Sequence, residues 1–112
     1  MLKLKIQDGV YNISFHKTNR LNSPMAESLR EELFKIVSKP GRKVKLSMKG
    51  INFIDSAGFE VIMAVVNRAS EVGSSFRISH VSGEVYELLK LMKLKVTLEI
   101  DPVKARDFVH AV

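Results

Sequence analysis

Two kinds of apolar periodicity alternate along this chain, and the alternation limits the fold more than any other feature of the sequence. Apolar side chains occupy every second position in Val10–Phe15 and again from Val44 to Met48, the spacing of strands with one buried face. After Pro24, Ala57 and Ser82 they recur three and four residues apart, the spacing of helices with one buried stripe. After one hairpin, strands and helices take turns, which predicts a mostly parallel sheet with right-handed crossovers.

Turn and capping residues mark the expected boundaries. Asp8-Gly9 is a strong hairpin signal, so residues 2–7 and 10–16 are expected to pair antiparallel at one edge of the sheet. Ser23 is expected to cap the first helix, with Pro24 at its first position. Gly73 is expected to end the second helix. The second half of the chain predicts strands at 76–78 and 96–100, a helix capped by Ser82, and a terminal helix that opens at Asp101-Pro102.

The expected fold is therefore α/β, with four or five strands and the helices mainly on one face of the sheet. In the helix that follows Ala57, the side chains of Ile62, Met63 and Val66 are expected to be buried. The chain has 112 residues and shows no repeat or linker, so a single domain over residues 1–112 is expected.

Composition excludes several classes of protein. Without cysteine there is no disulfide and no cysteine-based metal or redox chemistry. No apolar run approaches the roughly 20 residues that span a bilayer, and the first residues lack the apolar centre of a signal peptide. A cytoplasmic protein without membrane insertion is expected. The net charge of +6 is spread along the chain and is not interleaved with aromatic residues, so specific nucleic-acid binding is not expected.

Residue patterns for catalysis are missing as well. His16, His80 and His110 have no metal-ligand spacing, and the residues around Ser56 do not form a G-x-S-x-G nucleophile elbow. No glycine-rich phosphate loop is present in the sequence. We therefore expect neither enzymatic activity nor a metal or cofactor.

The segment Asp55-Ser56-Ala57-Gly58-Phe59 stands out because it lies where a strand passes into a helix. One interpretation is plain helix capping, in which Asp55 or Ser56 accepts a backbone hydrogen bond. The other is a phosphate acceptor, since free N–H groups and the positive end of the helix dipole would hold an added dianion. Spacing alone leaves both interpretations open.

This segment resembles the motif of STAS domains, and the order of elements matches that family over essentially the whole chain. In anti-sigma-factor antagonists of this family, a partner anti-sigma factor with serine kinase activity phosphorylates the serine that follows the aspartate; Ser56 matches it. The resemblance implies a non-enzymatic module that binds the kinase while Ser56 is unmodified and releases it afterwards. The residues that it implies for partner binding are Asn22, Asp55, Ser56, Ala57, Gly58 and Phe59.

Two features of the sequence depart from the family pattern. Ala57 replaces a second Ser or Thr, and Asn19-Arg20-Leu21-Asn22 replaces a loop that is usually acidic. The motif also resembles STAS subunits that bind the ATPase of phospholipid-trafficking ABC transporters without phosphorylation. An unswitched scaffold, with Ser56 as a simple helix cap, is a third alternative.

Overall fold

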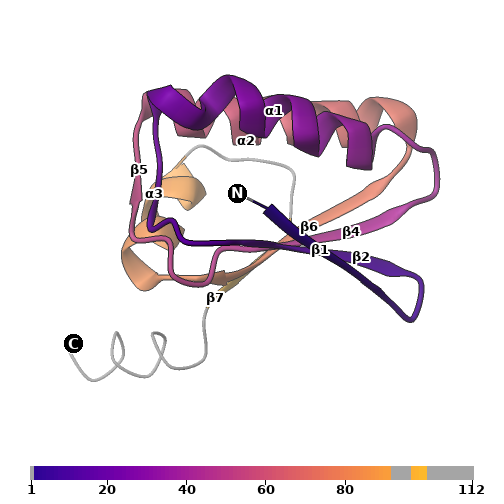
Figure 1. Ribbon diagram of the computed structural model, residues 1–112, viewed down its shortest axis with the longest axis horizontal. Helices are drawn as coiled ribbons and strands as arrows, with labels where there is room; N and C mark the ends of the chain where they lie inside the picture. Colours follow the sequence, from indigo (N-terminus) through magenta and orange to yellow (C-terminus); the bar gives the residue numbers. More distant parts are fainter. Residues whose placement is uncertain (1, 92–96, 101–112) are drawn as a thin grey trace.

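A tight hairpin forms one edge of the sheet, as its turn sequence predicts. The computed structural model describes residues 2–91 and the backbone of residues 97–100 (Figure 1). Strands β1 (Leu2–Gln7) and β2 (Val10–Phe15) pair antiparallel, with Gln7 opposite Val10. Asp8 and Gly9 between them both have positive φ angles, 52° and 78°, which is the backbone of a type I′ turn.

The hairpin continues into a five-stranded sheet with the order β1-β2-β4-β6-β7. Strands β4 (Lys43–Ser47), β6 (Ser75–Val81) and β7 (Thr97–Ile100) follow β2 in parallel. The predicted α/β class, the mostly parallel sheet and the antiparallel edge hairpin are confirmed. The predicted terminal helix from Asp101 and the position of His110 lie outside the described residues.

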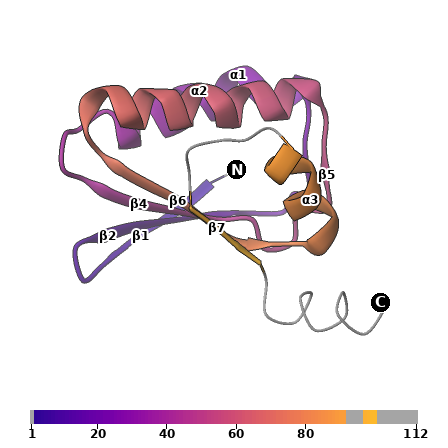
Figure 2. The same ribbon diagram turned by 180° about the vertical axis from the view of Figure 1, so that it is seen from behind.

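Helices α1 (Ser23–Val37) and α2 (Ser56–Val72) lie side by side over one face of this sheet. The view from behind shows the same layer, with the shorter α3 (Gly83–Leu91) at the end of the sheet near β5 (Figure 2). The Ser82 hydroxyl accepts the N–H of Val85 at 3.3 Å, so Ser82 caps α3 as predicted. The core between the layers is apolar; its largest fully buried side chains are Ile13, Leu21, Leu29, Leu33, Leu46, Met48, Ile51, Ile62, Ile78 and Leu89.

The buried stripe of α2 differs from the prediction on one side. Ile62 and Val66 are buried as predicted, but Met63 is 39% exposed, so its predicted burial is wrong. The helix buries Val61 and Val65 in its place. Because α2 is apolar on both flanks of its central stripe, periodicity could not determine which flank faces the core.

A second, two-stranded parallel sheet was not predicted. Strands β3 (Arg20–Leu21) and β5 (Phe53–Ile54) pair with Leu21 beside Ile54. Each strand has two residues, which is too short to leave a period in the sequence. This small sheet joins the segment before α1 to the segment before α2.

Candidate functional site

The β3–β5 sheet places the N-termini of α1 and α2 next to each other (Figure 1). The N–H of Asn52 donates to the Asn19 carbonyl at 2.9 Å, and the N–H of Asp55 donates to the Leu21 carbonyl at 3.0 Å. Asn22 follows β3 directly and Asp55 follows β5 directly, so parallel pairing brings these two predicted site residues together.

The Asp55 carboxylate caps both helices at once. Its Oδ1 accepts the N–H of Gly58 at 2.9 Å, which caps α2. Its Oδ2 accepts the N–H of Ser23 at 2.9 Å and the Ser23 hydroxyl at 3.2 Å, which satisfies the first turn of α1. The structure thus corrects the predicted cap of α1: its N-cap is Asn22, whose side chain makes no capping bond, and Ser23 is the first helical residue.

These hydrogen bonds keep Asp55 ionised. The Gly58 N–H lowers the pKa of the Asp55 carboxyl most; partial desolvation opposes this, and the N–H and hydroxyl of Ser23 lower the pKa further. A negative charge at this point also faces the positive ends of two helix dipoles. Asp55 is therefore a fixed anion that ties two helices together.

Ser56 has a different environment from its neighbour. It is the first residue of α2 and is exposed to solvent. Asp55 supplies the cap of the helix, and in the part of the chain that the structure describes the Ser56 hydroxyl makes no hydrogen bond. The serine hydroxyl is thus presented at a helix N-terminus without a capping role.

Gly58 explains how α2 packs so closely on the small sheet. It is buried, and a Cβ atom there would lie 2.6 Å from the Leu21 carbonyl oxygen and 2.8 Å from Cγ2 of Ile54. A side chain cannot fit against that backbone oxygen, so only glycine permits this approach. Gly58 thus lets the first turn of α2 lie directly against β3. Ala57 is partly exposed, and Phe59 is partly buried against the core.

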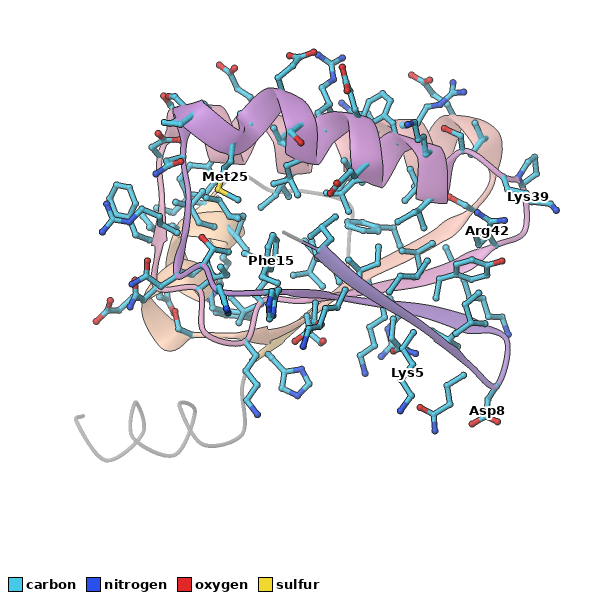
Figure 3. All side chains as sticks on the ribbon, in the orientation of Figure 1. Lys5, Asp8, Phe15, Met25, Lys39 and Arg42 are labelled. Atoms are coloured by element: carbon cyan, nitrogen blue, oxygen red, sulfur yellow. The ribbon has the colours of Figure 1, made fainter. Side chains whose placement is uncertain are left out.

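Three neighbouring residues of this surface were not among the predicted binding residues. Ser23 shares the Asp55 carboxylate, Phe53 is 49% exposed, and the Arg20 guanidinium lies 5.7 Å from the centre of the Phe53 ring. Beside them is a shallow depression, lined by Lys17, Thr18, Asn19, Arg20, Asn22 and Met25. Figure 3 labels Met25, on the first turn of α1. Only the unpredicted β3–β5 pairing brings Arg20 and Phe53 together, so the linear sequence gave no indication of this contact.

Among the described residues, no three His, Asp or Glu side chains gather in a way that could hold a metal ion. None of the helices α1 to α3 is both long and apolar enough to cross a membrane.

Comparison with known proteins identifies the family. The STAS domain family model matches residues 1–105. This chain belongs to the STAS domain family. The resemblance inferred from Asp55-Ser56 and the order of elements is thereby confirmed, and Ser56 lies where α2 of this STAS domain begins.

Solved structures share the fold of this STAS domain at low identity. A candidate anti-sigma factor antagonist of Thermotoga maritima aligns with a TM-score of 0.74 and 24% identity, covering 97% of this chain and 94% of that one. An anti-sigma-factor antagonist (STAS) domain protein of Planctomyces limnophilus gives 0.78 and 20%, covering 93% of each chain. The antagonist SpoIIAA in its unphosphorylated form gives 0.66 and 12% over the full length of both. No curated protein matches the sequence.

Proposed function

We propose that this STAS domain is an anti-sigma-factor antagonist, a non-enzymatic module that binds an anti-sigma kinase while Ser56 is unphosphorylated. One observation carries the proposal. Ser56 is exposed at the start of α2, and Asp55, not Ser56, caps that helix. A serine that is accessible and has no capping role is available to a kinase. The similar fold of antagonists such as SpoIIAA, described in its unphosphorylated form, supports the same role.

Phosphate on Ser56 would act through the adjacent Asp55. It would add about −1.5 to −2 charges next to a carboxylate that already holds the N–H groups of Ser23 and Gly58. Two anions would then compete for the same donors at the two helix N-termini. Modification would change both the charge of the surface and the link between α1 and α2, and either change would release a partner that fits the unmodified form.

The proposed partner surface combines an apolar centre with polar and basic surroundings. Phe53 is the exposed aromatic side chain next to the Asp55-Ser56 turn, and exposed aromatic residues are frequent anchors in protein interfaces. The Arg20 guanidinium lies over its ring, and Asn22, Ser56 and Ala57 lie at the adjoining N-termini of α1 and α2. A kinase that docks here should therefore offer an apolar pocket with acidic groups beside it.

Calorimetric titration with the anti-sigma kinase of the same organism tests the proposal. Ser56→Ala should bind like the wild type, whereas Ser56→Asp should bind at least about tenfold more weakly, equivalent to 1.4 kcal/mol. Ser70→Asp is the matched control, because Ser70 is an exposed serine near the other end of α2. Its affinity should not change.

Intact mass after incubation with the kinase and ATP gives a second readout. The wild type should gain one phosphate and Ser56→Ala none. Phosphate on Ser56→Ala would contradict the assignment of the site. Equal affinities for wild type, Ser56→Ala and Ser56→Asp would instead favour an unswitched scaffold or a subunit that binds a transporter ATPase.

A further inference from the structure

The free edge of β1 is an exposed feature that the Ser56 surface does not use. β1 is the first strand in the sheet order, so one of its backbone edges has no neighbouring strand within the described residues. Five of its six residues are exposed, including Leu4 at 49% and Ile6 at 57%. Outward N–H and C=O groups of an edge strand are ready to pair with a further strand.

The two sides of β1 have opposite chemistry. Leu4 lies beside Ile13, a core residue, and Ile6 lies beside Tyr11, which packs on the core. Leu4 and Ile6 are therefore both on the side of the sheet that faces the helices. Lys3 and Lys5 alternate with them on the other side, and Lys5 points away from the helices in Figure 3.

The basic side continues across the sheet. Lys5 lies beside Asn12, Asn12 beside Lys45, and Lys45 beside Arg77. The hollow on this side is also lined by Lys43, and among the described residues that line it Asp8 is the one carboxylate. Strands β4 and β6 thus add positive charge, on this side of the sheet, to that of Lys3 and Lys5 in β1.

We propose that β1 is a docking edge for an extended segment of a protein partner in which apolar and acidic residues alternate. An added strand would continue the pleat, so its side chains would alternate between the two sides of the sheet. Carboxylates would lie opposite Lys3 and Lys5, and apolar side chains would cover Leu4 and Ile6.

Two other occupants of the β1 edge, a second copy of this chain and a nucleic acid, fit it less well. If two copies paired through β1, lysines would face lysines across the new strand pair, and like charges directly opposite each other are destabilising. A nucleic acid would satisfy the lysines through its phosphates but would leave Leu4 and Ile6 exposed. A strand in which acidic and apolar residues alternate would pair with the lysines on one side and cover Leu4 and Ile6 on the other.

Amide NMR of the full chain tests the proposal with synthetic peptides. The probe peptide alternates valine or isoleucine with glutamate. One control peptide carries lysine in place of glutamate, and a second has the probe composition in scrambled order. The probe should shift the amide signals of residues 2–7 and slow hydrogen exchange at the outward amides at least about tenfold, as new strand pairing requires. Neither control peptide should do so.

Charge reversal gives the matched variants. In Lys3→Glu/Lys5→Glu the preference should invert, so that the lysine peptide binds and the glutamate peptide does not. Lys39→Glu/Lys49→Glu changes the net charge equally at exposed residues outside β1 and should keep the original preference. Ser56→Asp should have no effect, which separates this edge from the Ser56 surface.

Several results would overturn the proposal. They are equal effects of the probe and scrambled peptides, shifts centred away from residues 2–7, and an unchanged preference in Lys3→Glu/Lys5→Glu. Shifts of the β1 amides with protein concentration alone would indicate a second copy as the occupant. Protection of the same amides by duplex DNA but not by the probe would indicate a nucleic acid.

Discussion

Asp55 accepts hydrogen bonds from the N-termini of two helices, and the freedom of Ser56 follows from this. In many helices the residue that caps the N-terminus is a serine, whose hydroxyl is then occupied. Here the carboxylate holds Gly58 on one side and Ser23 on the other, so the next residue needs no structural role. The two residues of this dipeptide thus differ in role: Asp55 caps both helices, and Ser56 keeps an exposed hydroxyl with no capping bond.

This division predicts unequal effects of two alanine substitutions. Asp55→Ala removes the acceptor for both helix N-termini and should lower the melting temperature clearly. Ser56→Ala should change the free energy of unfolding by less than about 0.5 kcal/mol, as is usual for exposed residues. Thermal unfolding followed by circular dichroism measures both. A larger loss for Ser56→Ala than for Asp55→Ala would show that the serine is the cap.

The lowered pKa of Asp55 predicts a pH dependence with a definite sign. Above the unfolded-state pKa of about 4, Asp55 is ionised in both states and its stabilisation is fully present. As the pH falls towards the lower folded-state pKa, the unfolded chain takes up the proton first and the stabilisation is lost. Asp55→Asn cannot titrate, so the stability advantage of the wild type over Asp55→Asn should shrink below pH 4 or so.

Calorimetric melting of the wild type and Asp55→Asn at a series of pH values measures this difference in stability. Comparison of the pair cancels the titration of the other carboxylates. An advantage that stays constant from neutral pH to well below the usual range of aspartate would contradict the assigned role of Asp55.

Among the elements, α2 depends most on close contact, because Gly58 lies against the backbone of β3. Gly58→Ala should destabilise the protein by about 1–3 kcal/mol, the usual range for overpacking, since the Leu21 carbonyl oxygen cannot move away without breaking its bond to Asp55. Urea unfolding measures the loss. Ser56→Ala, in the same turn, is the control and should unfold like the wild type. Equal stability of Gly58→Ala would mean that α2 can shift from β3.

The long elements could be predicted from sequence, whereas the contacts that build the site could not. Periodicity and turn residues such as Asp8-Gly9 located the hairpin, the parallel strands and the three described helices. The Asp55-Ser56 motif indicated the candidate site. The pairing of Leu21 with Ile54 joins two short segments that have no period of their own, so the bond from Ser23 to Asp55 could not be foreseen. The burial of Met63 was predicted wrongly because α2 has apolar side chains on both flanks of its buried stripe.

At the scale of the whole molecule, the net charge of +6 affects how the domain binds polyanions such as DNA. Lys5, Lys43, Lys45 and Arg77 lie on one side of the sheet, and this basic surface is made of strand side chains and not of a helix that enters a DNA groove, as far as the described residues go. Any binding to duplex DNA should therefore be nonspecific, with an affinity that falls steeply between about 50 and 200 mM salt. Fluorescence anisotropy with two unrelated duplexes measures this. Preference for one duplex at physiological salt would contradict it.

The bond between Ser23 and Asp55 spans 32 positions of the chain, and the surface around Ser56 exists only after that span has closed. Closing a loop of this length has an entropic cost that only the completed packing of α1, α2 and the sheet offsets. A nascent chain that ends before β5, or a thermally opened copy, therefore lacks the surface altogether. A partner that requires this surface binds only folded copies, so heat that unfolds a fraction of the population lowers the amount of binding-competent protein by the same fraction, without any change in synthesis or modification.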